Sequence, residues 1–212
     1  GLKSDIDQQV VQATQDAQLA NYRYEQLLEF RHSIGVGLSH IRSREQERPV
    51  SVMRTEPFSV IEYSKTMPFS ELTNEARLQM FNHLTEQLQK YFFISVGGYA
   101  ILFQNHPALL PASSKAFSLP IKISYHAQIK NPPSIPLEFI QSTGGILSAT
   151  AIHIGPYETL SQTYELIIKW AKENGYALGT MAMEEHLITG QMVSSSELYT
   201  TQIFIPLTGS GF

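Results

Sequence analysis

The chain has 212 residues, of which 42% are hydrophobic, so it is long enough for one core of about 150 residues and an appendage. With 15 Lys and Arg residues and a net charge of −4, it lacks a broad positive surface for a phosphate backbone, and we do not expect this fragment to bind DNA by itself. The absence of cysteine excludes a disulfide framework, a thiol nucleophile and a zinc–thiolate site. No apolar run approaches the roughly 18 residues of a membrane span, and no signal peptide precedes the first element, so we expect a soluble, cytoplasmic protein without a membrane partner.

The first segment reads as a long helix. Apart from Gly1, residues 1 to 34 contain neither glycine nor proline. Apolar or small side chains recur there at spacings of four and three, at Ile6, Val10, Ala13, Ala17, Ala20, Tyr24, Leu27 and Ile34. This stripe predicts a homodimer formed along a coiled-coil seam, with packing on the helix's own domain as the alternative. We expect Gly35 and Gly37 to interrupt the helix and Pro49 to end a second one over 38–48.

The start of the chain lies inside this predicted helix and carries no Met. We therefore expect that a segment N-terminal to residue 1 belongs to the intact protein.

From residue 50 the pattern changes to short strands and two further helices. In chain order we predict strands at 51–54 and 58–63, a helix at 69–91, strands at 99–103 and 117–125, a strand at 146–154, a helix at 157–174, and strands at 180–188 and 197–205. A turn-rich linker with Pro132, Pro133 and Pro136 separates the two sets.

The second set repeats the first. Residues 67–72 (Met-Pro-Phe-Ser-Glu-Leu) precede the first of these helices, and residues 155–160 (Gly-Pro-Tyr-Glu-Thr-Leu) precede the second. Each half is therefore strand, helix, strand, strand, and neither can bury its sheet alone. We predict an α+β fold with a duplicated β-α-β-β unit, helices on one sheet face and a ligand cleft on the opposite face, preceded by a long N-terminal helix.

Residues 153–158 (His-Ile-Gly-Pro-Tyr-Glu), the following amphipathic helix with Trp170 and the closing strand at 203–207 resemble the effector-binding domain of GyrI-like proteins. With the long helix in front, the chain most resembles multidrug-binding regulators of the MerR family. The resemblance implies a dimerisation and linker helix at 1–48 and an effector-binding domain at 50–208. It also implies a winged-helix DNA-binding domain N-terminal to this sequence, through which alone the parent protein would bind DNA.

The resemblance also assigns candidate ligand-binding residues. Glu184 matches the acidic residue that meets the positive charge of the drug in those regulators, and Glu197 and Tyr199 match a glutamate and a tyrosine of their final strand. The tyrosine expected just before the strand at 99–103 is a glycine here, Gly97. Tyr157, Tyr99 and His186 complete the set of candidates.

Strand alternation suggests how Glu184 would act. Met183 and Leu187 share one face, which we take as the floor under the helices, while Glu184 points to the other face and into the cleft. A partly desolvated carboxylate gains by pairing with a cation, and an aromatic ring adds about 0.5 to 2 kcal/mol. This combination predicts broad specificity for flat, apolar, positively charged molecules. The alternatives are that Glu184 is a solvated surface residue or that a one-residue register error exchanges it with Glu185.

Two other functions remain open from the sequence. A GyrI-like hydrolase would use the cleft glutamate as a general base, but no Ser-His-Asp set, phosphate loop or metal-ligand spacing reinforces an enzyme. A contact-type inhibitory protein would not need the long helix. We therefore expect a sensor that is not an enzyme and has no metal or cofactor.

Overall fold

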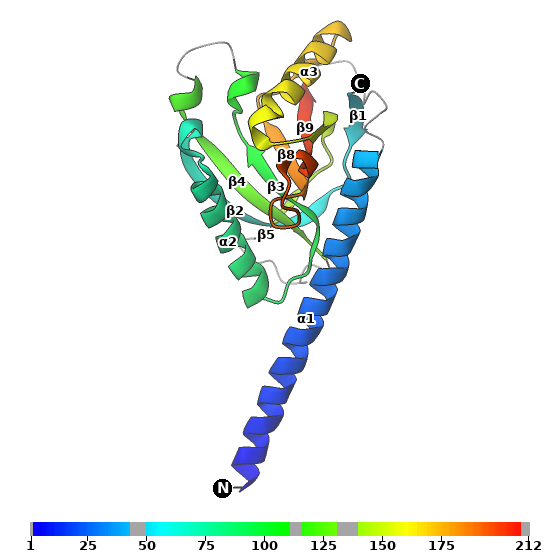
Figure 1. Cartoon of the computed structure of the whole chain (residues 1–212). Coiled ribbons are helices and arrows are strands. Elements are labelled where there is room, and N and C mark those ends of the chain that lie inside the picture. The colour runs from blue at the N-terminus through cyan, green and yellow to red at the C-terminus, as the bar shows by residue number, and fades with distance from the viewer. Residues whose placement is uncertain (1, 43–49, 111–115, 131–139, 209–212) are drawn as a thin grey trace.

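A computed structural model describes residues 2–42, 50–110, 116–130 and 140–208 of the chain (Figure 1). The helices are α1 (Leu2–Arg42), α2 (Asn74–Lys90) and α3 (Leu160–Glu173). The strands are β1 (Ser51–Arg54), β2 (Phe58–Pro68), β3 (Ser95–Phe103), β4 (Pro120–Ile129), β5 (Ile140–Thr143), β6 (Leu147–Ile154), β7 (Ala177–Leu178), β8 (Ala182–Ile188) and β9 (Thr200–Thr208). Short 3₁₀ turns are η1 (Phe69–Glu71), η2 (Pro107–Leu109), η3 (Ala116–Ser118), η4 (Tyr157–Thr159) and η5 (Ser196–Leu198).

The predicted duplication is confirmed by the sheet. The strands pair antiparallel in the order β1-β6-β9-β8-β3-β4-β2-β5, with β7 on β9. One half is β2-α2-β3-β4 and the other is β6-α3-β8-β9, each with its first strand placed outside its third. The halves meet where β3 pairs with β8, so that Tyr99 lies opposite His186 and Ile101 opposite Glu184. The 67–72 and 155–160 segments form equivalent turns, η1 and η4, before α2 and α3.

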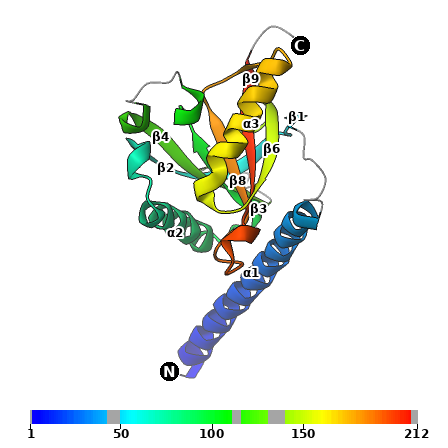
Figure 2. The same cartoon turned by 45° about the horizontal axis from the view of Figure 1, so that its top comes forward.

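Each half has its own core beneath its own helix, and both helices cover the same sheet face (Figure 2). Thr73 caps α2 by accepting a hydrogen bond from the Ala76 N–H (3.2 Å), and helical spacing then turns one apolar side toward the first half. That side is formed by Met80, Leu84 and Leu88. The buried side of α3 is formed by Leu160, Tyr164, Ile167 and Ala171. The seam between β3 and β8 therefore lies beneath the gap between the two helices.

The C-terminal half of α1 packs on the domain. Tyr22 is buried with its ring edge-on to Phe92 (centroids 5.9 Å apart), and the Ser95 hydroxyl donates to the side-chain amide oxygen Oε1 of Gln26 at 3.1 Å. Further along, the Lys130 ammonium lies 2.9 Å from a carboxylate oxygen of Glu29. One face of α1 therefore packs on its own domain, which is the alternative to a coiled-coil seam that the sequence left open for this helix.

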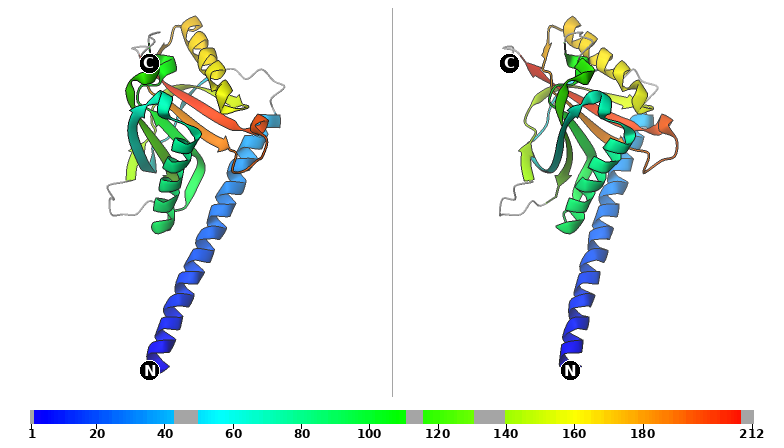
Figure 3. Two further views of the ribbon diagram at one scale, coloured as in Figure 1. Left: turned by 60° about the vertical axis from the view of Figure 1, so that its left-hand side comes forward. Right: turned by 90° about the vertical axis from the view of Figure 1, so that its left-hand side faces the viewer.

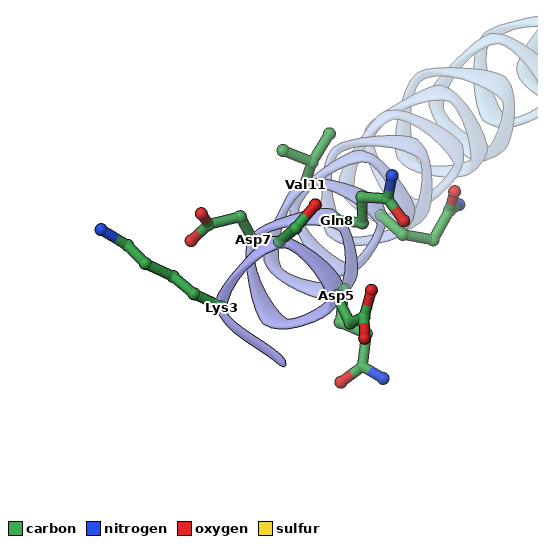
Figure 4. A pocket seen from close by; sticks show the side chains of 8 residues that line it. Lys3, Asp5, Asp7, Gln8 and Val11 are labelled. Atoms are coloured by element: carbon green, nitrogen blue, oxygen red, sulfur yellow. The ribbon is translucent and has the colours of Figure 1, made fainter. Parts of the chain in front are cut away.

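The predicted apolar stripe lies on the opposite face. Residues 3–21 are all exposed, and α1 extends well beyond the domain (Figure 3). Within the stripe, Val10, Tyr24 and Leu27 are each more than half exposed. At the N-terminal end, the side chains of Lys3, Asp5 and Asp7 radiate away from the helix axis and form no enclosed site (Figure 4). The stripe thus has no partner among the residues that the structure describes.

The predicted break in this helix is wrong, because α1 is continuous through Gly35 and Gly37. Glycine inside a helix costs only about 1 kcal/mol, and here a glycine allows close packing. A Cβ on Gly37 would lie 2.5 Å from Ile188 Cγ1, whereas a Cβ on Gly35 would meet nothing within 4 Å. Pro49 and the Pro132–Pro136 linker lie outside the described residues.

Other element boundaries also differ from the prediction. β2 and β4 are longer than expected, since they pair with each other from Val60–Gln128 to Pro68–Pro120. The helix expected from residue 69 begins at Asn74, after η1. The final strand begins at Thr200, because residues 196–198 form η5. The strands β5 and β7 were not predicted. No described helix is both long and apolar enough to cross a membrane.

The two glycines of α1 provide a matched test of its docking. We expect Gly35→Ala to stabilise the protein by about 0.5–1 kcal/mol through helix propensity, because this position is open. Gly37→Ala should lose that gain or destabilise by about 1 kcal/mol, because its methyl group forces Ile188 to move. Urea unfolding of both variants measures the difference. An equal gain in both would show that α1 does not dock on the domain.

Candidate functional site

A pocket of about 420 Å³ lies between α2, the η4 turn and the segment that joins β8 to β9. It sits on the helix-bearing face, above the seam where the two halves meet. Its aromatic lining comes from both halves and consists of Phe81, Tyr99, Tyr125, Tyr157 and Tyr199. An apolar-walled cleft of this size with a few polar groups is typical of a small-molecule site.

The aromatic rings form two groups. Phe81 of α2 lies edge-on to Tyr99 with centroids 4.4 Å apart. From the second half, Tyr157 lies against Tyr199 at 5.0 Å and edge-on to the His186 ring at 5.2 Å. Because the two groups belong to different halves, the pocket depends on the pairing of β3 with β8.

The segment at 153–158 positions Tyr157. His153 Nδ1 lies 2.9 Å from Thr163 Oγ1, and Nε2 lies 3.1 Å from Thr159 Oγ1. The imidazole therefore joins the end of β6 to η4 and to the first turn of α3. Gly155 has φ = 139°, a conformation that favours glycine. The turn at residues 155–157 directs Tyr157 toward the pocket, and the contacts of His153 hold this turn in place.

Four of the six predicted ligand residues line the pocket, namely Tyr99, Tyr157, His186 and Tyr199. Glu184 lies beneath this lining, on the same sheet face as Ile101 and His186, and its exposed fraction is 2%. Glu197 lies on η5, is exposed, and is not among the lining residues.

The prediction that the cleft lies on the face opposite the helices is wrong for this pocket. Alternation correctly separated Glu184 from Met183, but Glu184 is on the helix side and Met183 faces away from the helices. The reason is that the larger apolar side chains of the sheet under α3 come from β9, through Ile203 and Ile205, whereas β8 contributes only the small side chain of Ala182 to that core. β8 runs under the gap between the helices, where polar side chains are tolerated. Alternation shows which residues share a face but not which face the helices cover.

Glu184 is a buried carboxyl group with incomplete hydrogen bonding. The Tyr164 hydroxyl donates to Oε1 at 3.0 Å, while Nε2 of His186 lies 3.7 Å from Oε2. Among the described residues, Oε2 accepts no hydrogen bond. Burial raises the pKa of Glu184, and the positive charge of Arg77 opposes this shift. Burial also lowers the pKa of His186 to about 3, so that its imidazole is neutral and gives the carboxylate no counter-ion.

Sequence reasoning missed several lining residues, including Phe81, Tyr125 and Glu158, and the one with the greatest electrostatic effect is Arg77. It lines the pocket from α2, and its charge favours the ionised forms of Tyr125 and Glu184. Nothing in the sequence signals this role, because an arginine on a polar helix is ordinarily a solvated surface residue. With Glu158 also in the lining, the pocket wall carries both signs of charge.

A comparison with protein families identifies the domain that carries this pocket. The model of the GyrI-like small molecule binding domain matches residues 48–208. The chain belongs to the GyrI-like family. This match covers both halves of the repeat and every residue of the pocket. No curated protein is significantly similar in sequence to the chain.

Several solved structures share the GyrI-like fold at low identity. A complex of EcmrR with DNA, 14% identical, has a TM-score of 0.60 and covers 96% of this chain and 70% of that chain. The C-terminal domain of EcmrR, a MerR-family regulator, also 14% identical, has a TM-score of 0.62 and covers 78% of this chain and 100% of that domain. A conserved protein from Listeria innocua, 10% identical, has a TM-score of 0.52 and covers 78% and 98% of the two chains. The first match includes α1 as well as the GyrI-like domain.

The described residues contain no group of three or more His, Asp or Glu side chains that could hold a metal ion.

The raised pKa of Glu184 predicts a pH-dependent effect on stability. The folded protein holds this proton more tightly than the unfolded chain, so this residue's contribution to stability is lost as the pH rises above about 4.5 through the raised pKa. We expect Glu184→Gln to raise the free energy of unfolding at pH 7.5 by about 1–3 kcal/mol, and with it the unfolding temperature. The amide oxygen still accepts a hydrogen bond from Tyr164, but no charge is buried.

Thermal unfolding of both proteins between pH 4.5 and 8 measures this difference, which should shrink toward pH 4.5. Glu165→Gln on the exposed side of α3 serves as the control. A destabilised Glu184→Gln protein at pH 7.5 would contradict a burial cost at this position.

Proposed function

We propose that this GyrI-like domain is the ligand-sensing part of a bacterial transcription regulator that binds lipophilic aromatic molecules. The observation that carries the proposal is the 420 Å³ pocket, with five aromatic rings drawn from both halves above a buried carboxyl group. In this proposal the ligand separates or tightens the two halves, and the change passes to a DNA-binding domain N-terminal to this sequence.

Two contacts support a route from the pocket to α1. The pocket lining includes His186 and Thr189, which flank Ile188, and Gly37 of α1 packs on Ile188. Helix α2 contributes Phe81 to the pocket, and Phe92, two residues beyond its end, contacts Tyr22 of α1. A ligand that moves α2 relative to β8 would therefore change both contacts of α1, that of Gly37 with Ile188 and that of Tyr22 with Phe92. Coupling between ligand binding and the position of α1 requires such a difference in contacts between the two states.

The preferred ligand is a flat aromatic cation. Glu184 lies beneath the lining, so a cation in the pocket would act on its carboxylate through space and without direct contact, as the charge of Arg77 does. The neutral His186 supplies no such charge, and the surrounding tyrosine rings favour a cation over their faces. Arg77 competes for the same carboxylate. The charge preference of the pocket thus depends on the balance between Glu184 and Arg77.

Calorimetric titration with ethidium, and with anionic fluorescein as a comparison, tests this balance. We expect Glu184→Gln to weaken ethidium binding about tenfold and Arg77→Met to strengthen it by a similar factor, since each change is worth about 1.4 kcal/mol. Tyr199→Ala should also weaken binding, while Tyr24→Ala, an exposed tyrosine on α1, should not. Undiminished ethidium binding by Glu184→Gln would contradict the cation preference, and wild-type protein that binds neither dye would contradict the aromatic pocket.

The exposed stripe of α1 supports a homodimer. Its apolar residues lie opposite the face that docks on the domain, so a second α1 could pack there without displacing the first contact. We expect light scattering to give a dimer at micromolar concentration and Val10→Glu with Leu27→Glu to shift the chain to a monomer. Leu166→Glu, an exposed leucine on α3, is the matched control and should leave the dimer intact. A wild-type monomer at high concentration would contradict the proposal.

We further propose binding without turnover. A hydrolase would need its general base in contact with substrate or water. Here Glu184 lies beneath the lining residues, engaged by Tyr164, and its exposed fraction is 2%.

A further inference from the structure

The sheet curls so strongly that its two edges meet. In the strand order, β1 and β6 form one end of the sheet and β2 and β5 form the other. Short connections nevertheless link the two ends, because residues 55–57 join β1 to β2 and residues 144–146 join β5 to β6. The Gly145 N–H donates to the Thr55 carbonyl at 2.7 Å, and the Arg54 guanidinium donates to the Gly145 carbonyl at 2.7 Å. The face away from the helices is therefore the concave inside of a nearly closed sheet, and the interiors of such sheets hold small ligands.

A second pocket, of about 220 Å³, lies on this concave face. It is separate from the helix-side pocket, because the two have no lining residue in common. Large apolar side chains line it from four strands, namely Met53, Phe58, Met183 and Phe204. Polar side chains also contribute to its wall, among them Thr55, Gln128 and Gln202. An apolar cavity of about 150 Å³ holds a benzene molecule, so this one has room for a single ring and a short side chain.

His126 brings unsatisfied polar atoms to this pocket. Its exposed fraction is 4%, and neither ring nitrogen has a hydrogen-bond partner among the described residues. The nearest charged group is Glu62, whose Oε2 lies 3.9 Å from His126 Nε2, beyond hydrogen-bond distance. A buried imidazole with both nitrogens unpaired is rare in native proteins, and a ligand would satisfy it.

Glu185 supplies the charge of the pocket. Among the described residues, Glu185 is the charged residue that lines this pocket, and the lining contains no Lys or Arg. Burial raises the pKa of Glu185. With no Lys or Arg in the described lining, its carboxylate has no cationic side chain beside it in this pocket. This differs from the helix-side pocket, where Arg77 opposes Glu184.

We propose that the concave face is a second ligand site, specific for small primary amines that carry one aromatic ring. The ammonium group pairs with Glu185 and donates a hydrogen bond to His126, and the ring lies among Met53, Phe58 and Phe204. The site adds a second input to the sensor and does not depend on the ligand proposed for the helix-side pocket.

The probe is 2-phenylethylamine, with 2-phenylethanol as the neutral molecule of matched size. Chain labelled with ¹³C at the methionine methyl groups is titrated and followed by NMR. We expect the signals of Met53 and Met183 to move with the amine while Met80, in the core under α2, stays in place. The alcohol should bind about tenfold more weakly.

Variants locate the site and separate it from the first pocket. Glu185→Gln and His126→Phe should each weaken amine binding about tenfold, whereas Glu165→Gln and the helix-side variant Tyr199→Ala should leave it unchanged. The proposal is overturned if wild-type Met53 and Met183 signals do not move at millimolar amine, or if amine and alcohol bind equally. Loss of amine binding in Tyr199→Ala would place the amine in the helix-side pocket and overturn it too. The comparison of amine with alcohol uses wild-type protein, so it stands even if a variant fails to fold.

Discussion

The antiparallel pairing of β3 with β8 is the constraint on which the rest of the molecule depends. Each half of the repeat buries its apolar side chains under its own helix, so the seam between the halves is left without a helix above it. At this seam Ile101 lies opposite Glu184 and Tyr99 opposite His186. Polar side chains placed there are buried by the sheet and the neighbouring rings but only partly hydrogen-bonded, since Glu184 Oε2 and His186 Nε2 have no partner among the described residues.

The same strand serves both faces of the sheet. Along β8, Glu184 and His186 face the helices, while Met183 and Glu185 face the concave side. Two adjacent carboxyl groups therefore lie in different surroundings: Glu184 is buried and opposed by Arg77, and Glu185 is half-buried on the concave side. Because a buried carboxylate is costly without a partner, each of these positions favours a ligand of complementary charge.

Helix α1 has two faces with different environments. One face is fixed to the domain through Tyr22, Gln26 and Glu29, and it touches Ile188 next to the helix-side pocket. The other carries the apolar stripe and is exposed along the helix. A long helix that packs beside the pocket at one end and extends far beyond the domain at the other can convert a small shift near the ligand into a larger displacement at its tip.

The sequence by itself determined the duplicated unit, because the 67–72 and 155–160 segments and the order of apolar patterns recur. It also determined the family and the residues that share a face with Glu184, since strand alternation is fixed by backbone geometry. Tertiary structure alone decided which sheet face the helices cover, because alternation is symmetric with respect to the two faces. It also decided the roles of Arg77 and His126, residues without a sequence motif whose surroundings come from distant strands and helices. The continuity of α1 through Gly37 was likewise set by packing on Ile188, a contact between segments about 150 residues apart that no local propensity can encode.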